Sequence, residues 1–246
     1  MTAWPTGYGL KEFDEIDSTN EEARRLAASG ERGPVWITAR HQTAGRGRRG
    51  RKWESPTGNL AATLLLSPEK PASECAQLSF VSALAVFDTI VGFEPDAEIR
   101  VKWPNDVLVN GRKIAGILLE SASQGANPVF LAIGIGINLK THPSDTEFPA
   151  TSLASLGLAA PLPRHALLEL AGPFAKWYDI WRGEGFSPIR DAWLARAAGL
   201  GTRIRARLQN EETSGMFEGI DMTGALLLRE AQDRLRTISA GEVYFG

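Results

Sequence analysis

Cysteine and histidine are scarce in this chain of 246 residues, and neither sign of charge dominates it. The single cysteine, Cys75, has no partner within the chain for a disulfide, which suits a reducing cytoplasm. The three histidines, His41, His142 and His165, are too few and too scattered for a transition-metal site. With 27 Lys and Arg against 29 Asp and Glu, the net charge is -2, so the chain as a whole is not suited to coating a nucleic acid. Any anion-binding function must therefore be local.

The sequence also lacks the patterns of an export signal and of a membrane anchor. Residues 1–11 hold Trp4, Pro5 and two glycines, but no apolar core of signal-peptide length. The longest uncharged stretch mixes Ser, Gln, Asn, Pro and Gly with its apolar residues, which would leave many polar groups in lipid. We therefore expect a cytoplasmic protein without membrane contact. Its 43% hydrophobic and 23% charged residues are typical of a globular fold.

Apolar periodicity divides the chain into a mixed α/β region and a β-rich end. The helical pattern is strongest over residues 74–91, and Asn110-Gly111 predicts a tight hairpin turn. The predicted helices are 16–29, 74–91, 165–181 and 188–198. The predicted strands are 35–39, 60–66, 99–103, 107–109, 113–120 and 129–139 in the first region, and 203–208, 215–220, 225–229 and 235–238 in the second. The predicted fold class is α+β, with a mixed-sheet domain over residues 1–197 and a small antiparallel barrel over residues 198–246.

A basic loop separates the first two predicted strands. Residues 40–52 read RHQTAGRGRRGRK, with no carboxylate until Glu54. Its glycines let the backbone approach a ligand closely, and its guanidinium groups match the geometry of phosphate or carboxylate. A solvated basic loop or an RNA-binding segment is the alternative for such a run. The cations are confined to one loop, which ends in Trp53, and the indole of Trp53 has a broad face suited to one planar ring. The loop is therefore better suited to a single nucleotide than to a nucleic-acid polymer.

Two lysines lie near the next strands. Residues 102–106, Lys-Trp-Pro-Asn-Asp, end a strand and present an amide and a carboxylate, although a plain Asx turn explains the same residues. Lys113 begins the strand 113–120, which is apolar on both faces and therefore central in the sheet. A lysine at the start of a core strand can meet a buried anion, although a solvated hairpin lysine is the common alternative.

The strand 133–138 has two unequal faces. Isoleucines fill one face, while Gly134, Gly136 and Asn138 share the other. Glycines are tolerated in a strand where a ligand or another backbone comes close. This face is equally compatible with the floor of a pocket, in which Asn138 reads a polar edge, and with a packed helix.

Together these segments resemble the catalytic and C-terminal domains of biotin protein ligases, in the same order and over nearly the whole chain. The matching motifs are DSTN at 17–20, GRGRRGRKW at 45–53, KWPND at 102–106, KIAGILLE at 113–120, GIGIN at 134–138 and GIDMTGALLLR at 219–229. The resemblance implies a catalytic domain of the biotin/lipoate ligase type, related to class II aminoacyl-tRNA synthetases, and an SH3-like C-terminal domain. Some members of the family carry an N-terminal helix-turn-helix domain. Because the motifs here begin at Asp17, the resemblance implies a ligase with no DNA partner.

The resemblance also implies an activity and a role for each matching residue. Biotin and ATP would be the substrates, with Mg²⁺ on the pyrophosphate side, and biotin would pass from biotinyl-AMP to a lysine of a biotin carboxyl carrier protein or another carboxylase carrier domain. Lys113 and Arg48 would be catalytic. The biotin-binding residues would be Ser18, Thr19, Asn20, Gln42, Gly45, Arg46, Gly47, Arg48, Lys113 and Gly116. The residues that bind ATP and the adenylate would be Arg46, Arg48, Trp53, Asn105, Lys113 and Asn138, with Asp106 as a polar neighbour.

A lipoate protein ligase is the nearest alternative, because it has a related fold and also adenylates an acyl cofactor. The GRGRRGR loop and the β-rich C-terminal region favour biotin. A third hypothesis is an RNA-binding module built on the Arg-Gly loop. The sequence leaves open which carrier is modified and whether the protein is a monomer or a homodimer.

Overall fold

The structure is a computed structural model that describes residues 3–124 and 127–245. The larger sheet consists of β1 (Gly9–Ile16), β2 (Val35–Gln42), β3 (Leu60–Leu66), β4 (Ile99–Lys102), β5 (Asp106–Val109), β6 (Arg112–Gln124) and β7 (Asn127–Ile137). Its strand order is β1-β2-β3-β7-β6-β5-β4. Because β1 runs parallel to β2 while the remaining pairs are antiparallel, the sheet is mixed, as the sequence predicted.

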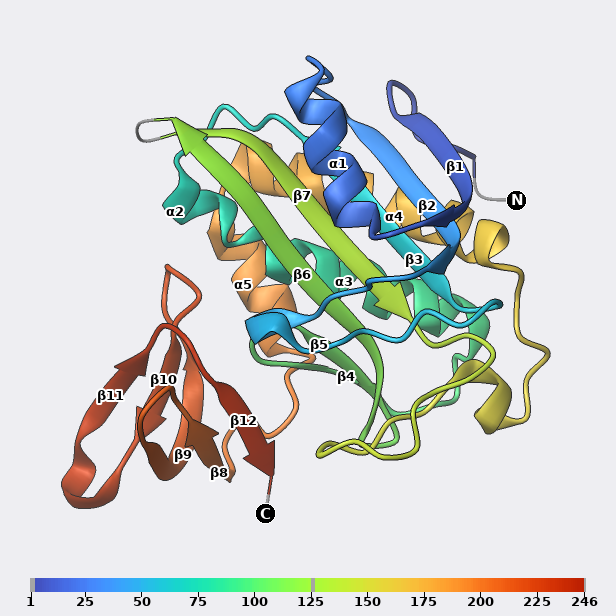
Figure 1. Ribbon diagram of the computed structural model, residues 1–246. Coiled ribbons are helices and arrows are strands. Elements are labelled where there is room, and N and C mark those ends of the chain that lie inside the picture. Colours follow the sequence, from blue (N-terminus) through green and yellow to red (C-terminus); the bar gives the residue numbers. More distant parts are fainter. Residues whose placement is uncertain (1–2, 125–126, 246) are drawn as a thin grey trace.

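Helices cover both faces of this sheet (Figure 1). α1 (Thr19–Ala28) lies on one face, against β2, β3 and β7. The other face carries α3 (Leu78–Phe93), α4 (Pro163–Glu184) and α5 (Phe186–Leu194). The short helical segments are α2 (Ala72–Cys75), η1 (Arg48–Gly50), η2 (Leu153–Leu156) and η3 (Ala231–Asp233). The face that carries α1 also carries the basic loop.

The central helix α3 is apolar almost all round because it packs against the sheet on one side and against α4 and α5 on the other. With α2 it forms a stretch, Ala72–Phe93, that is long and apolar enough by composition alone to cross a membrane, with a mean hydropathy of 1.6. Most of this stretch is buried inside the protein, which is the position of a core helix. The predicted helix does pack on the sheet. It is buried on more sides than the predicted amphipathic pattern implied, because α4 and α5 cover it as well.

The smaller sheet consists of β8 (Arg203–Arg207), β9 (Glu212–Ile220), β10 (Leu226–Arg229), β11 (Leu235–Ile238) and β12 (Glu242–Phe245). Its strand order is β11-β10-β9-β8-β12, and its pairs are antiparallel. The turn at 221–224 docks on the larger part of the protein, where Trp103 Nε1 donates to Gly224 O at 3.0 Å and Gln77 Nε2 donates to Met222 O at 3.2 Å. Buried apolar residues of both sheets form one continuous core. The two parts are thus held against each other.

The α+β fold class is confirmed, but two strands were missed. β1 reads GLKEFDEI and lies at an edge of the sheet with little of it buried, so it shows no alternation of apolar and polar residues. Charged residues are common on edge strands because they discourage pairing with another chain. β12 has only 4 residues and also lies at an edge, so its pattern is too short to identify. Helix α5 begins earlier and ends earlier than predicted.

Candidate active site

One cavity of about 390 Å³ lies between the sheet, the start of α1, the basic loop and β12. Most of the residues predicted to bind ligands line it: Ser18, Thr19, Asn20, Gln42, Arg46, Gly47, Arg48, Trp53, Asn105, Lys113 and Gly116. Gly45 is not among its lining residues, and Asn138 lines a second, smaller cavity of about 170 Å³ that shares Trp53 and Lys113 with the first. The fold thus brings together motifs that are far apart in the sequence.

One end of the cavity is polar but uncharged. Ser18, with extended backbone, is the N-cap residue of α1, but its side chain makes no capping bond. The Thr19 backbone N–H and hydroxyl donate to Gln42 Oε1 at 2.8 and 3.1 Å, and Gln42 Nε2 donates to Ser55 Oγ at 2.7 Å. Thr63 on β3, which the sequence reasoning missed, lies below with its hydroxyl 2.7 Å from the Thr19 hydroxyl. This cluster holds fixed amide and hydroxyl groups at the cavity wall.

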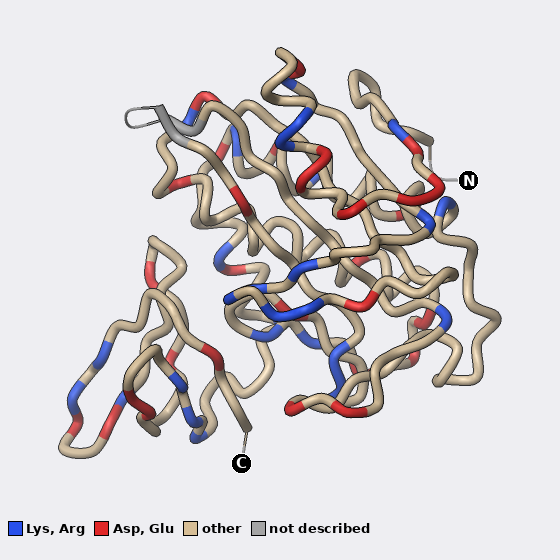
Figure 2. The backbone as a smooth tube through the Cα atoms, in the orientation of Figure 1, with Lys and Arg blue, Asp and Glu red and all other residues tan. Residues whose placement is uncertain are grey.

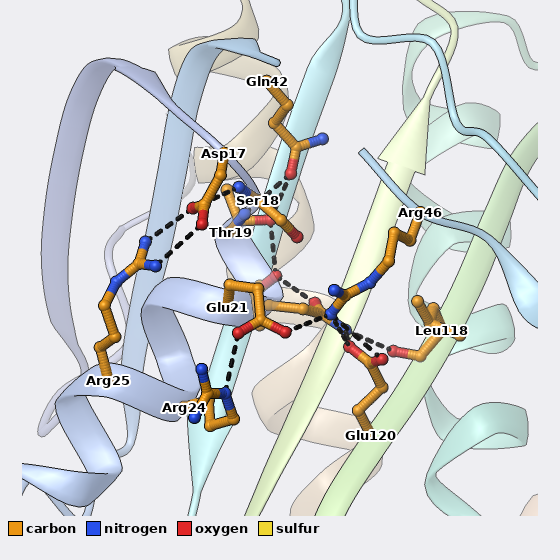
Figure 3. A network of polar contacts seen from close by, with 12 residues as sticks. Asp17, Ser18, Thr19, Glu21, Arg24, Arg25, Gln42, Arg46, Leu118 and Glu120 are labelled. Atoms are coloured by element: carbon orange, nitrogen blue, oxygen red, sulfur yellow. Dashed lines mark hydrogen bonds and ion pairs between the residues drawn. The ribbon is translucent and has the colours of Figure 1, made fainter. Parts of the chain in front are cut away.

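Arg46 is held above that cluster by two carboxylates (Figure 3). Its guanidinium lies 2.6 Å from Glu21 Oε1 and 3.4 Å from Glu120 Oε1. The hydrogen bond with Glu21 raises the pKa of Arg46 and lowers that of Glu21. Glu120 Oε2 also accepts a bond from Asn20 Nδ2 at 2.7 Å. The arginine therefore has carboxylate partners at the place where the sequence predicted a ligand anion.

The next two arginines of the loop reach toward the C-terminal strand. Arg48 donates to Asn105 Oδ1 and to Gly241 O, both at 3.3 Å, and Arg51 pairs with Glu242 on β12. Burial lowers the pKa of Arg48. Figure 2 shows the loop as a run of Lys and Arg in front of the sheet. Because three of its arginines, Arg46, Arg48 and Arg51, have carboxylate, amide or carbonyl partners, most of the loop is directed inward and not toward an RNA-binding surface.

Asn105 has partners at both ends of its amide group. Its Nδ2 donates to Ile117 O at 2.6 Å, while its Oδ1 accepts the bond from Arg48. The side chain thus joins Arg48 to the backbone of β6. This geometry suits a residue that positions the arginine, in addition to the nucleotide contact that the sequence predicted.

Lys113 lines both cavities, and its side chain lies against Asp106. Its Nζ lies 2.6 Å from Asp106 Oδ1, in an ionic contact without the alignment of a hydrogen bond. The loop before η2 fixes the backbone, because Lys113 N donates to Pro149 O at 2.8 Å and Thr151 N donates to Lys113 O at 2.9 Å. A firmly held backbone and an ammonium group at the cavity wall, paired with one carboxylate, suit a group that meets a substrate anion.

The glycine face of β7 is occupied by two side chains of the site itself. A Cβ at Gly136 would overlap the indole of Trp53, and a Cβ at Gly134 would overlap the amide of Asn20. A Cβ at Gly116 on β6 would lie 3.2 Å from Trp53 and 3.3 Å from Lys113 Nζ. The glycines are therefore needed because site residues lie directly on the sheet. From the sequence, the glycine face was compatible with a pocket floor or with a packed helix. The structure shows both: Gly136 lies under the cavity residue Trp53, and Gly134 lies under Asn20 of α1.

Asn138 lies at the smaller cavity, beside Trp53 and Lys113, and its predicted contact with the nucleotide stays a prediction. It is 3% exposed, and its Nδ2 donates to Thr151 O at 3.0 Å while its backbone N–H donates to Ile114 O at 2.8 Å. The side chain therefore anchors the segment that follows Pro149 and reaches only the smaller cavity.

Several cavity residues were not predicted to be part of the site. They are Lys102, the 145–148 segment, and residues 242–244 of β12. The last group is far from the basic loop along the sequence but touches it in the fold: Arg51 and Glu242 are 191 positions apart and in contact. Tertiary contacts bring the last two segments to the cavity, so no local pattern could have revealed them, whereas Lys102 belongs to the KWPND motif and was passed over.

Comparison with known proteins agrees with this geometry. Residues 12–138 match the biotin/lipoate A/B protein ligase family, and residues 199–246 match the biotin protein ligase C-terminal domain. The chain is 49% identical over 236 residues to the biotin acetyl-CoA-carboxylase ligase of Paracoccus denitrificans, covering 94% of this chain and 98% of that protein. It is 36% identical to the bifunctional ligase/repressor BirA of Bacillus subtilis, covering 98% of this chain and 75% of that protein.

A solved structure shows the same fold. The biotin protein ligase from Aquifex aeolicus in complex with biotin and ATP superposes with a TM-score of 0.83 at 26% identity, over 96% of this chain and 97% of that one. The chain therefore belongs to the biotin/lipoate A/B protein ligase family, within its biotin protein ligase branch.

Proposed function

We propose that the protein activates biotin with ATP to give biotinyl-AMP and then transfers the biotin to a lysine of a carboxylase carrier domain. The observation that carries this proposal is one cavity with an uncharged polar end at Thr19 and Gln42 and with cations beyond it at Arg48 and Lys113. Biotin has the matching form, with a neutral ureido ring at one end and a carboxylate at the other. The relatives named as biotin ligases support the same substrate.

Biotin is better supported than lipoate. A ureido group has N–H donors and a carbonyl acceptor, which the amide of Gln42 and the hydroxyls of Ser18 and Thr19 can pair with. A dithiolane ring has no N–H or carbonyl group of this kind, so it would form none of these additional hydrogen bonds with the cavity wall. The C-terminal domain match is also to biotin protein ligases.

In the first step a carboxylate oxygen of biotin attacks the α-phosphorus of ATP. The bond from that phosphorus to the bridging oxygen of the β-phosphate breaks, and pyrophosphate leaves. Both reactants are anionic, so cations must offset their repulsion. Lys113 and Arg48 line the cavity at a position to do so, while Arg46 exchanges Glu21 and Glu120 for the ligand.

We propose that Mg²⁺ enters as the complex with ATP. Among the residues that the structure describes, no cluster of three or more His, Cys, Asp or Glu side chains could hold a metal ion. Mg²⁺ is commonly held by one or two carboxylates together with substrate phosphates. Asp106 lines the cavity and is suited to such a contact.

In the second step the uncharged ε-amine of the carrier lysine attacks the acyl carbon of biotinyl-AMP. An amide forms, the acyl–phosphate bond breaks and AMP leaves. The proposed partner is therefore a biotin carboxyl carrier protein or a related carrier domain, modified on one lysine.

Calorimetric titration with biotin, lipoate and a short RNA tests the substrate class, together with biotin-dependent exchange of labelled pyrophosphate into ATP. Biotin should bind and support exchange, whereas lipoate and RNA should do neither. Pyrophosphate exchange that depends on lipoate would identify the protein as a lipoate ligase. RNA binding without exchange would favour the Arg-Gly loop as an RNA site.

Trp53→Ala should weaken ATP binding more than biotin binding. Trp53 borders both cavities, whereas the polar end of the site lies at Gln42. A lost stacking face costs about 1 to 3 kcal/mol. Trp4→Ala, which removes a partly buried indole that lines neither cavity, is the matched control, and titration with each substrate is the measurement. Equal losses for both ligands would mean that Trp53 is simply part of the packing.

Two glycine substitutions should separate the two substrates. Gly136→Ala displaces Trp53 and is expected to weaken ATP, while Gly134→Ala displaces Asn20 and is expected to weaken biotin. Overpacking of this kind costs about 1 to 3 kcal/mol. Each variant is the control for the other because both add one methyl group to the same face of β7. The assignment fails if both variants weaken the same substrate.

The remaining features of the proposal rest on the sequence. We propose a cytoplasmic protein with no DNA partner, with a domain boundary between residues 197 and 198. The net charge of -2 and the buried thiol of Cys75 support the first two points. The oligomeric state is an open prediction, and sedimentation with and without biotin and ATP distinguishes a monomer from a homodimer.

A further inference from the structure

Lys102 is a buried cation for which the described part of the chain supplies no ion-pair partner. It is the last residue of strand β4 and is only 5% exposed. Within the described ranges, 3–124 and 127–245, its ammonium group takes part in no hydrogen bond and no ion pair, and its contacts are with aromatic rings. Buried charges are costly unless they are paired, so a lysine in this position needs an explanation.

The aromatic rings come from two distant segments. The Nζ of Lys102 lies 3.3 Å from the ring centre of Phe148, 5.6 Å from that of Tyr244 and 5.8 Å from that of Phe245. A cation over an aromatic face is stabilised, but by less than the burial of an ammonium group costs. Burial accordingly lowers the pKa of Lys102 to about 8.

The charged groups around Lys102 do not replace an ion pair. Asp106 and Glu242 favour its charged form, while Lys113 and Arg51 oppose it. Asp106 is already paired with Lys113, and Glu242 with Arg51. Glu147, on the loop that carries Phe148, is paired with Arg207 at 2.6 Å. The ammonium of Lys102 therefore keeps its hydrogen-bond donors unused inside the cavity wall.

The position of Lys102 within the cavity indicates which anion it meets. The polar end of the cavity lies at α1, which packs on β2, β3 and β7. Lys113 is on β6, next to β7, whereas Lys102 is on β4, the edge strand three places from β7. With neighbouring strands about 4.8 Å apart, that is roughly 14 Å from β7. The cations thus follow one another across the sheet, away from the polar end.

We propose that Lys102 binds the β- and γ-phosphate oxygens of ATP and holds the pyrophosphate as it leaves. This inference rests on the proposed function, in which the α-phosphate meets the biotin carboxylate near Lys113. The rest of the triphosphate then extends toward β4. With phosphate oxygens as partners, Lys102 gains the charge-assisted hydrogen bonds that no residue around it supplies.

The test compares Lys102→Met with Lys102→Arg and with wild type in the two half-reactions. For Lys102→Met, kcat/KM for ATP in biotin-dependent pyrophosphate exchange should fall by about 100-fold. Transfer from chemically synthesised biotinyl-AMP to a carrier domain should be unchanged, because no pyrophosphate takes part in that step. Lys102→Arg should recover part of the exchange. Arg100→Met, which removes an exposed cation from the same strand, is the matched control and should match wild type.

Stability provides a second readout that separates phosphate binding from a structural role. The pKa of Lys102 lies below the ordinary lysine value of 10.5, so its charge destabilises the folded state at pH 7, and this cost disappears as the pH rises from about 8 to 10.5. Lys102→Met should therefore keep or raise Tm at pH 7, by up to about 2 to 4 °C. A lower Tm with both half-reactions reduced equally would overturn the proposal in favour of a packing role.

Binding of inorganic pyrophosphate tests the role of Lys102 independently of the proposed ligase activity. Calorimetry measures this binding. Wild type should bind pyrophosphate, and Lys102→Met should bind it at least about 10-fold more weakly. Equal binding by both proteins overturns the role of Lys102. If wild type shows no biotin-dependent exchange but loses pyrophosphate binding on substitution of Lys102, the proposed function fails and the phosphate site stands.

Discussion

Lys113→Ala is expected to reduce biotin-dependent pyrophosphate exchange by about 1,000-fold while the protein remains folded. The side chain contributes an ammonium group to the cavity and little to the core, since 26% of it is exposed and its ionic contact with Asp106 is poorly aligned. A charge-assisted contact is worth about 1.5 to 3 kcal/mol in a ground state. In a water-poor transition state with two anionic reactants the same cation is worth more.

Arg112→Ala is the matched control for this result. Arg112 precedes Lys113 on β6 and is exposed, so its loss removes a cation from the same strand without changing the cavity. Circular dichroism and thermal unfolding of both variants establish that they are folded. If Lys113→Ala retains exchange at the level of Arg112→Ala, Lys113 is a surface lysine of a hairpin and has no catalytic role.

Local sequence patterns predicted the elements that are buried and regular. The central strands of the larger sheet and most of the smaller sheet were found because their apolar residues recur with the period of a strand. The edge strand β1 was missed because its Lys, Glu and Asp side chains face solvent, so burial left no pattern in its sequence. The strand β12 was missed because 4 residues are too few to show a pattern, although it covers one end of the cavity.

Prediction of the site was limited by distance along the chain. Thr19 and Lys113 were predicted because they belong to motifs that the family resemblance makes specific, and the fold brings both to one cavity together with Gln42. Lys102 belongs to such a motif as well, but only its burial against Phe148 and β12 shows that its charge has no partner. The contact of Asn138 with the nucleotide stays a prediction from its motif. Sequence alone did not reveal that its amide also anchors the segment at Thr151.

The loop Gly45–Lys52 should open in the free protein and close when biotin and ATP are both bound. Its contacts with the rest of the protein are mainly arginine pairs, and the side chains of Arg46 and Arg51 are 38% and 57% exposed. Exposed ion pairs contribute about 0 to 1 kcal/mol each, whereas fixing the backbone costs about 1 to 2 kcal/mol per residue. The adenylate offers Arg46 and Arg48 carboxylate-derived and phosphate oxygens together, so its formation should order the loop best.

Trypsin cleavage measures this closure. Arg49, Arg51 and Lys52 are exposed, so cutting at the loop should be fast in the free protein and slow with both ligands. Arg48→Gly should lose the protection and release biotinyl-AMP, which then modifies exposed lysines indiscriminately. Arg49→Gly is the matched control, because Arg49 lines neither cavity and has a φ of 58°, which glycine adopts without strain. It should keep both the protection and the adenylate. If free wild-type protein resists trypsin at this loop as well as the liganded form does, the arginine pairs suffice to hold the loop, and it is a preformed clamp.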